Sequence, residues 1–131
     1  MKILLVDDDQ NMRRALRRFL ERYGHQIAGE AYDGEVGLSL ARELNPDVVV
    51  MDLKMPHMTG TEAARLLRKS HPHIDVIIHS AYDEAAFKAV ATKAGAVCYI
   101  VKGEGPTQLL NLLHELENRR AEVRVPSPIA S

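Results

Sequence analysis

Short apolar segments alternate along the chain with segments in which apolar and polar residues follow a helical period. The apolar segments are rich in valine and isoleucine and are flanked by polar or turn-forming residues. Such segments are typical of strands that are buried on both faces of a sheet. Four of them are distinct, at residues 3–6, 48–51, 76–78 and 97–101, and a weaker fifth covers residues 26–31.

Between these strands, apolar residues recur at positions i, i+3, i+4 and i+7, which places them on one face of a helix. Signals for helix ends agree with this period. Asn45-Pro46 ends the second helix, a capping box from Thr59 to Glu62 opens the third, and Gly95 ends the fourth. The apolar faces of the five predicted helices lie within residues 12–23, 36–44, 63–67, 83–93 and 109–116.

Five strand–helix units in succession predict an α/β fold, because right-handed crossovers turn them into a parallel sheet with helices on both faces. Residues 1–121 of the 131 then form one domain of ordinary size. The final sequence, VRVPSPIAS, holds two prolines and no apolar period. We therefore assign residues 122–131 to a C-terminal tail or linker.

Charge and composition narrow the classes of function. The chain carries 17 lysines and arginines against 18 acidic residues, and its net charge of −1 gives no electrostatic case for binding nucleic acid. Its apolar runs are far shorter than the roughly 18 residues of a membrane-spanning helix. The single cysteine, Cys98, excludes an internal disulfide and suits a reducing compartment. We expect a cytoplasmic domain that binds neither nucleic acid nor membrane.

Polar groups that can do chemistry follow four of the five predicted strands. These groups are Asp7 and Asp8, Asp52, Ser80 and Lys102. In an open parallel sheet such strand ends lie along one edge, where function gathers. Each residue alone has an ordinary explanation, such as a turn, a helix cap or a solvated charge. Together, the carboxylates predict an oxygen-ligated Mg²⁺ site, and the hydroxyl and ammonium beside it predict a pocket for a phosphoryl group.

The same stretches resemble the receiver domain of bacterial two-component response regulators. "ILLVDDD", "VVVMDLKMPHMTG", "VIIHSA" and "AGAVCYIVK" are similar to that family's segments in order and spacing. The resemblance covers residues 2–120, nearly the whole chain. It implies a flavodoxin-like (βα)5 fold, a doubly wound sheet of five parallel strands in the order 2-1-3-4-5.

By this resemblance, Asp52 is the phosphoacceptor, and its carboxylate takes a phosphoryl group from a phosphohistidine of a sensor histidine kinase. Asp8 ligates Mg²⁺ directly and Asp7 does so largely through water. The metal set is completed by Asp52 itself and by the backbone carbonyl of Lys54. The ammonium of Lys102 helps to neutralise the phosphoryl oxygens.

The resemblance also implies how the domain signals. Ser80 donates its hydroxyl to the new phosphate, and Tyr99 swings inward as Ser80 moves, which biases a two-state element. In the family, the fourth and fifth helices and the fifth strand form the face that controls an output domain or downstream protein. A homodimer through that face is an open alternative. We expect a signalling switch and not an enzyme, because such a domain catalyses only its own phosphorylation and dephosphorylation.

Several positions near the site carry their own expectations. The family usually has Lys-Pro with a cis bond after the fifth strand, whereas this chain has Lys102-Gly103, so we expect a trans bond or a mobile loop there. Tyr82 stands two residues after Ser80, and we predict that it shields the phosphate from water. We interpret Asp9 as the cap of the first helix. The arginines of that helix, at positions 13, 14, 17, 18 and 22, are expected to form a solvated face, with kinase docking as the alternative.

Two other functions compete with the signalling switch. Phosphatases of the haloacid dehalogenase type also use an aspartate nucleophile, Mg²⁺ and a lysine on a parallel sheet. Their nucleophile follows the first strand in a D-x-D motif, whereas the candidate here follows the third. The second alternative is the receiver part of a longer DNA-binding transcriptional regulator, whose DNA-binding domain lies outside these 131 residues.

Overall fold

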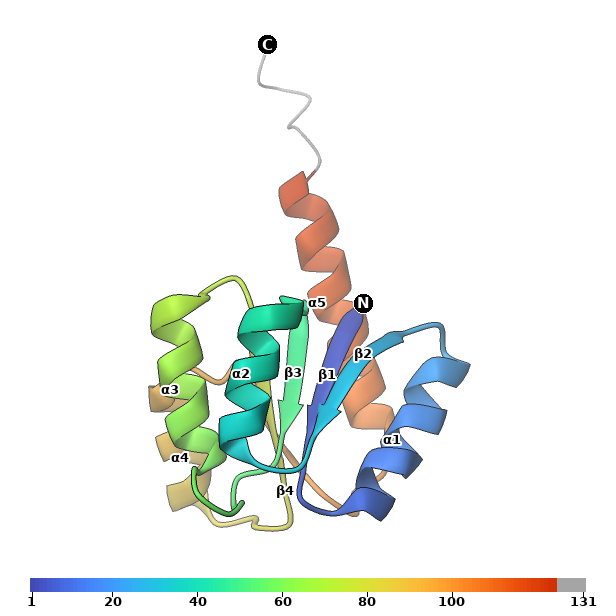
Figure 1. Cartoon of the computed structure of the whole chain (residues 1–131). Helices are drawn as coiled ribbons and strands as arrows, with labels where there is room; N and C mark the ends of the chain where they lie inside the picture. The colour runs from blue at the N-terminus through green and yellow to red at the C-terminus, as the bar shows by residue number, and fades with distance from the viewer. Residues whose placement is uncertain (125–131) are drawn as a thin grey trace.

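The computed structural model describes residues 1–124. Five strands form one parallel sheet in the order β2-β1-β3-β4-β5. They are β1 (Lys2–Val6), β2 (Gln26–Ala31), β3 (Val48–Met51), β4 (Asp75–Ser80) and β5 (Cys98–Val101). The expected flavodoxin-like topology is confirmed, and each strand lies where an apolar segment predicted one (Figure 1).

Helices cover both faces of this sheet (Figure 1). Successive residues of a strand point to opposite faces. Leu4 and Val6 therefore pack in one apolar cluster, with residues of α2, α3 and α4, whereas Ile3 and Leu5 pack in a second, with residues of α1 and α5. The helices are α1 (Gln10–Arg22), α2 (Gly34–Leu44), α3 (Gly60–Ser70), α4 (Ala85–Ala94) and α5 (Thr107–Arg124).

Two helices begin at the caps that the sequence predicted. The carboxylate of Asp9 accepts hydrogen bonds from the backbone N–H groups of Asn11 and Met12, at 2.9 and 3.3 Å, at the start of α1. The hydroxyl of Thr59 accepts one from the N–H of Glu62, at 3.1 Å, at the start of α3. These side chains satisfy amides that have no partner inside their helix.

Two helix boundaries differ from the expectation. α4 begins at Ala85 and not near Asp83, because Glu84 has an extended backbone and occupies the N-cap position. α5 continues to Arg124, three residues into the segment assigned to the tail. The rest of that segment, 125–131, lies outside the described residues, so the domain boundary stays a prediction. Within residues 1–124, no helix combines the length and the apolar character needed to span a membrane.

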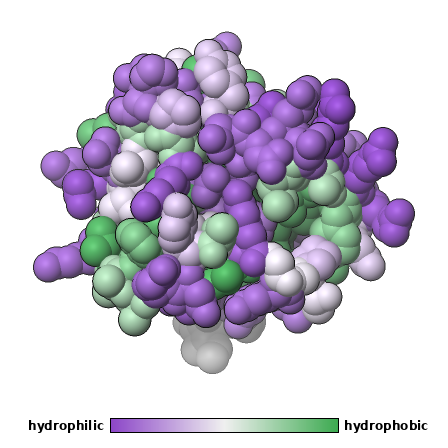
Figure 2. All heavy atoms as spheres, turned by 90° about the horizontal axis from the view of Figure 1, so that it is seen from below, coloured by the Kyte–Doolittle hydropathy of each residue, from purple (hydrophilic) through white to green (hydrophobic). Residues whose placement is uncertain are grey.

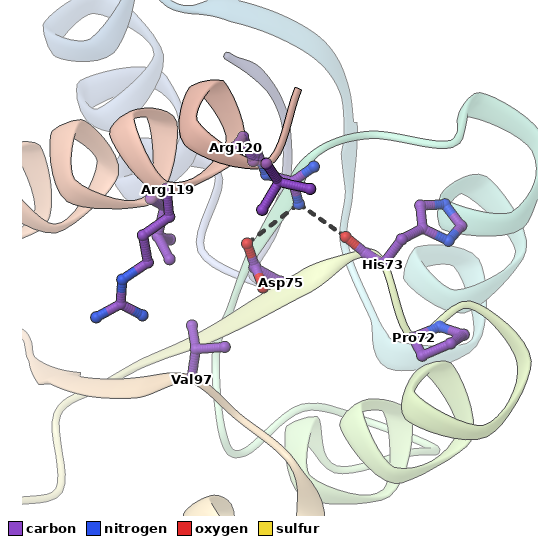
Figure 3. A pocket seen from close by; sticks show the side chains of 8 residues that line it. Pro72, His73, Asp75, Val97, Arg119 and Arg120 are labelled. Carbon is purple, nitrogen blue, oxygen red and sulfur yellow. Dashed lines mark hydrogen bonds and ion pairs between the residues drawn. The ribbon is translucent and has the colours of Figure 1, made fainter. Parts of the chain in front are cut away.

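Arg120 makes several polar contacts at the edge of the sheet where the strands begin (Figure 3). Its Nη2 atom donates to the carbonyl oxygens of Asp47 and His73, at 2.8 and 2.7 Å, and lies 3.1 Å from the carboxylate of Asp75. These contacts fix the C-terminal half of α5 against the segments that lead into β3 and β4. The predicted site lies at the opposite edge of the sheet.

Candidate functional site

The carboxyl ends of β1, β3 and β5 bring three charged residues together. Asp7, Asp52 and Lys102 each follow the last residue of their strand directly. Backbone hydrogen bonds continue past the strand ends: the N–H of Asp52 donates to the carbonyl of Val6 at 2.8 Å, and that of Asp7 to the carbonyl of Ala31 at 3.0 Å. The two acids are therefore carried by backbone that the sheet holds in place. Figure 2 views the molecule from this end, where many hydrophilic side chains reach the surface.

Three carboxylates converge at this edge. Oxygen atoms of Asp7, Asp8 and Asp52 lie within 4.8 Å of one another. Asp7 and Asp52 are buried, whereas Asp8 is exposed. Like charges this close repel one another and favour a bound cation. Hard oxygen donors next to solvent suit Mg²⁺, which commonly binds to one or two carboxylates and keeps several waters. The residues present fit the expected metal, while the carbonyl of Lys54 as a further ligand stays a prediction.

Lys102 supplies a positive charge to the same cluster. Its ammonium lies 2.8 Å from Asp7 Oδ2 and 3.1 Å from Asp52 Oδ2. Burial by itself lowers the pKa of a lysine, but the hydrogen bond to Asp7 and the charges of both acids outweigh it, so the pKa of Lys102 is raised. Lys102 is therefore a fixed cation at neutral pH. One ammonium does not balance three carboxylates, which leaves the site short of positive charge.

The surroundings of Asp52 disfavour its ionised form. Burial raises its pKa, and the charge of Asp7 raises it further, against the opposing effects of Lys102 and of the Leu53 N–H. That N–H donates to Asp52 Oδ1 at 2.8 Å, while Lys102 contacts the other oxygen. Both oxygens of the carboxylate are thus oriented by contacts on the protein. A cation bound at this position would relieve the excess negative charge.

Ser80 and Tyr99 are linked through the loop that follows β4. Ser80 is fully buried at the end of that strand, and its hydroxyl accepts a hydrogen bond from the N–H of Tyr82 at 3.2 Å. The hydroxyl of Tyr99 donates to the carbonyl of the same Tyr82 at 2.6 Å. The backbone of Tyr82 therefore contacts both residues.

Tyr82 also forms a small aromatic group with a lysine. The ammonium of Lys54 lies 4.3 Å from the centre of the Tyr82 ring, within the range of a cation–π interaction. The ring of Phe87 packs against Tyr82 with 5.3 Å between ring centres. Lys54 follows Asp52 by two residues, and the shielding of the phosphate by Tyr82 stays a prediction.

The loop after β5 keeps Lys102 in reach of the acids without the proline that is usual in the family. There are no cis peptide bonds within residues 1–124, so the expected trans bond at Lys102-Gly103 is confirmed. Gly103 and Gly105 have φ angles of 89° and 92°, in the region that favours glycine. The two glycines thus allow the tight turn that leads from Lys102 into α5.

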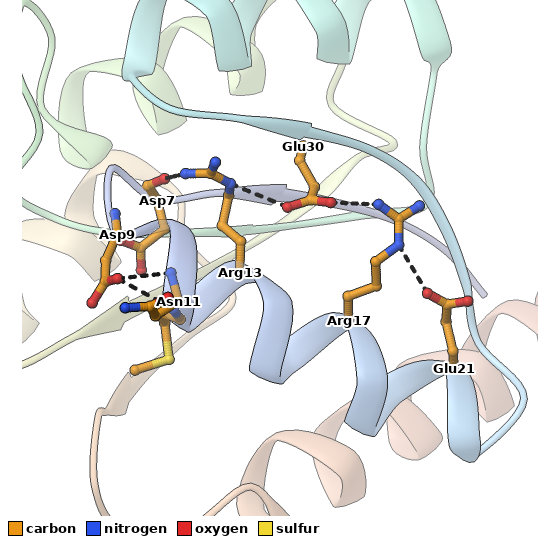
Figure 4. Close-up of polar contacts among 8 residues, drawn as sticks. Asp7, Asp9, Asn11, Arg13, Arg17, Glu21 and Glu30 are labelled. Atoms are coloured by element: carbon orange, nitrogen blue, oxygen red, sulfur yellow. Dashed lines mark hydrogen bonds and ion pairs between the residues drawn. The ribbon is translucent and has the colours of Figure 1, made fainter.

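The expectation of a solvated arginine face on α1 is wrong for Arg13, whose side chain is 14% exposed, whereas the side chain of Arg17 is 41% exposed. Arg13 and Arg17 both pair with the carboxylate of Glu30 on β2, and Arg13 also donates to the backbone carbonyl of Asp7 (Figure 4). The i, i+4 spacing of the two arginines placed them on one face. Their partner is far away in the sequence, so the spacing gave no sign of it.

The sequence also did not reveal the surroundings of His79. It lies on β4 beside Ser80, is 8% exposed, and its Nδ1 atom has no hydrogen-bond partner among the described residues. It lines a cavity of about 290 Å³ together with residues of α1 and of the start of α5. Burial, helped by the charge of Lys102, lowers the pKa of His79 to about 4. His79 is therefore neutral at neutral pH.

A comparison of the amino-acid sequence with models of protein families shows the family of this chain. Residues 3–114 match the model of the response regulator receiver domain. The chain belongs to this family. A receiver domain is a signalling switch and not a conventional enzyme, and response regulators work with sensor kinases and output domains. Receiver domains generally bind Mg²⁺ at their acidic pocket.

Individual relatives agree with this assignment. The receiver domain is 40% identical over 117 residues to response regulator GacA of Pseudomonas aeruginosa, covering 88% of this chain and 55% of GacA. It is 36% identical over 115 residues to chemotaxis protein CheY of Thermotoga maritima, covering 88% of this chain and 96% of CheY.

A solved structure gives the same result in three dimensions. A DNA-binding response regulator of the LuxR family from Staphylococcus aureus superimposes with a TM-score of 0.84 at 26% identity, covering 89% of this chain and 98% of that one. Compared with the two curated relatives above, this receiver domain spans about half the length of GacA and nearly all of CheY.

Proposed function

We propose that this receiver domain accepts a phosphoryl group on Asp52 from a phosphohistidine of a sensor histidine kinase, in a reaction that depends on Mg²⁺. The observation that supports the proposal is the placement of Asp52. It is buried at the end of a central strand, within 4.8 Å of two other carboxylates, and an ammonium lies 3.1 Å from one of its oxygens. Such a site combines a nucleophile with groups that bind a dianion.

The transfer follows from the charges on these residues. Asp52 is an anion at neutral pH and needs no general base, so one carboxylate oxygen bonds to phosphorus while the bond from phosphorus to the kinase histidine nitrogen breaks. Lys102 is positioned to neutralise a phosphoryl oxygen. A bound Mg²⁺ would supply further neutralisation of the phosphoryl oxygens. Asp7 and Asp8 would hold that ion, and the Lys54 carbonyl would complete its protein ligands.

The signal would travel from the phosphate to the surface through Ser80. We propose that the Ser80 hydroxyl donates to the new phosphate and so gives up its present bond from the Tyr82 N–H. The loop that carries Tyr82 then shifts. The hydrogen bond from the Tyr99 hydroxyl to the Tyr82 carbonyl breaks, and Tyr99 turns inward. Through this change the α4-β5-α5 face would control an output domain or a downstream protein in the cytoplasm.

Acetyl phosphate provides a direct test without a kinase. The chain is incubated with acetyl phosphate and Mg²⁺ and its intact mass is measured. A gain of one phosphoryl group that is absent in Asp52→Asn and in EDTA supports the proposal. No gain in the presence of Mg²⁺ would contradict it. Rapid turnover of acetyl phosphate or other phosphomonoesters without accumulation would support the aspartate phosphatase instead.

A second candidate concerns the whole protein. The chain spans about half the length of GacA, and one solved relative is a DNA-binding response regulator of the LuxR family. These observations favour the receiver part of a longer transcriptional regulator, whereas the full-length match to CheY favours a stand-alone switch. An antibody against this domain separates them by the size of the protein in the native cell. Detection of a protein about twice the size of this chain, which also binds DNA, supports the regulator. Detection of a protein of about the size of this chain contradicts it.

A further inference from the structure

Arg13 connects the acid site to the neighbouring strand β2 (Figure 4). Its Nη1 atom donates to the backbone carbonyl of Asp7 at 2.5 Å, and its Nε donates to Glu30 Oε1 at 3.1 Å. The Arg13 side chain is 14% exposed, so this contact is made largely away from water. One guanidinium thus contacts the backbone of an acid of the site and the side chain of a residue on the sheet.

With the contact from Arg13, the backbone N–H, the backbone carbonyl and the carboxylate of Asp7 all have hydrogen-bond partners. Its backbone N–H donates to the carbonyl of Ala31, while its carboxylate accepts from the N–H of Asp9 at 2.9 Å and from Lys102 at 2.8 Å. The bond from Arg13 engages the remaining backbone group, the carbonyl. This carbonyl belongs to the peptide bond that leads to Asp8. The orientation of that peptide decides how the two carboxylates are placed relative to each other.

Glu30 holds the guanidinium in the position that this contact needs. Glu30 precedes Ala31 on β2, so the residue that accepts from the Asp7 N–H and the residue that orients Arg13 are neighbours on one strand. The second oxygen of Glu30 pairs with Arg17, which also contacts Glu21 at 2.8 Å. The two arginines use different oxygens of Glu30, so the bond that orients Arg13, to Oε1, does not depend on Arg17.

We propose that Arg13 is a positioning residue for the metal-binding acids, oriented by Glu30. This inference rests on the proposed Mg²⁺-dependent function. Arg13 fixes the peptide between Asp7 and Asp8, so that both carboxylates face the ion without a conformational cost at the moment of binding. Groups that orient metal ligands in this way commonly account for a 10–100-fold effect on metal affinity.

The direction of the effect separates positioning from plain electrostatics. A cation next to a metal site repels Mg²⁺, so the loss of the Arg13 charge alone would tighten Mg²⁺ binding. If Arg13 positions the acids, its removal weakens binding in spite of the lost repulsion. A salt bridge that only attaches α1 to β2 would lower the stability of the fold and leave the Mg²⁺ affinity of the folded protein unweakened.

Isothermal titration calorimetry with MgCl₂ measures this difference on the whole chain. We expect Arg13→Ala to raise the dissociation constant about tenfold. Arg13→Lys keeps the charge but loses the guanidinium, whose separate nitrogen atoms contact Asp7 and Glu30. It should raise the dissociation constant by a smaller factor. Arg17→Ala is the matched control: it removes the same charge from the same helix and leaves both Arg13 contacts intact, so its constant should stay within about twofold of wild type.

A second measurement separates affinity from catalysis. For phosphorylation by acetyl phosphate, Arg13→Ala should shift the half-saturating Mg²⁺ concentration upward and leave the rate at saturating Mg²⁺ close to that of wild type. Unchanged or tighter Mg²⁺ binding in both Arg13 variants would overturn the inference, and so would equal weakening in Arg17→Ala. If Arg13→Ala does not fold, Arg13→Lys decides. Failure of the wild-type chain itself to bind Mg²⁺ would instead refute the proposed function.

Discussion

His79 should make the fold sensitive to mild acid. The residue is 8% exposed, its Nδ1 has no partner among the described residues, and its pKa is lowered to about 4. In the unfolded chain a histidine titrates near its ordinary pKa of about 6.5. Between these two values the unfolded state binds more protons than the folded state. Stability is therefore fully present above pH 6.5 and is lost as the pH falls toward 4.

The size of the loss follows from the two pKa values. At about pH 7 the imidazole is almost entirely neutral in both states and contributes close to nothing. At about pH 5 it is mostly protonated in the unfolded chain but neutral in the fold, which favours unfolding by about 2 kcal/mol. This is a large part of the roughly 5–15 kcal/mol by which domains of this kind are stable.

Urea denaturation in EDTA at about pH 7, 6 and 5 measures this loss, with His79→Leu as the variant. Leucine does not titrate, and it leaves no buried Nδ1 without a partner, so the variant should fold at neutral pH. Its stability should fall by about 2 kcal/mol less than that of wild type between pH 7 and 5. Effects of other titrating groups, including Asp52, cancel in the comparison.

His57→Asn serves as the control for this experiment. His57 is exposed and has a φ angle of 70°, a conformation that asparagine tolerates. Its pH dependence should match that of wild type. Identical pH dependence in wild type and His79→Leu would refute the reasoning, because it would mean that His79 is protonated as readily in the fold as in the unfolded chain.

Four other variants test separate parts of the structure. Arg120→Ala should lower the free energy of unfolding by about 3 kcal/mol in urea denaturation, because it removes the contacts of one guanidinium with the carboxylates of Asp47 and Asp75 and with the carbonyls of Asp47 and His73. Asp9→Ala should cost about 1 kcal/mol, seen as a lower Tm, because it removes the cap of α1. Tyr82→Ala should speed loss of the phosphoryl group about 3- to 10-fold in a mass-based time course, equivalent to roughly 0.7–1.4 kcal/mol of barrier. Asp52→Asn should raise the Tm in EDTA, because the pKa of Asp52 is raised and its charged form is disfavoured in the fold.

Each of these variants has an outcome that contradicts its rationale. Wild-type stability in Arg120→Ala would mean that water replaces the contacts of Arg120 without a loss of stability. An unchanged Tm in Asp9→Ala would mean that water replaces the hydrogen bonds of the Asp9 carboxylate equally well. Unchanged hydrolysis in Tyr82→Ala would show that the ring does not shield the phosphate. A lower Tm for Asp52→Asn in EDTA would show that the contact with Lys102 outweighs burial and the repulsion from Asp7.

The candidate site divides into a part that the sequence predicts and a part that it does not. Asp7, Asp52 and Lys102 come directly after apolar strands, and parallel strands end at a common edge, so their meeting follows from periodicity and topology. The link from Tyr99 to the Tyr82 carbonyl does not follow in this way. It depends on the path of the loop after β4, and loop paths carry no periodic signal.

By itself, the amino-acid sequence determined the strands, two of the helix caps, the parallel βα succession and the strand ends that hold the acids, while the strand order came from the family resemblance. Those features are local, or follow from the few ways in which βα units connect. Only the tertiary structure decided which charges are paired and which polar groups are desolvated. Arg13 and Arg14 are neighbours of the same type, yet Arg13 reaches Asp7 and Glu30. His79 is likewise an ordinary histidine in the sequence, and its low pKa comes from the elements packed around it, because burial and contact distances belong to the assembled molecule.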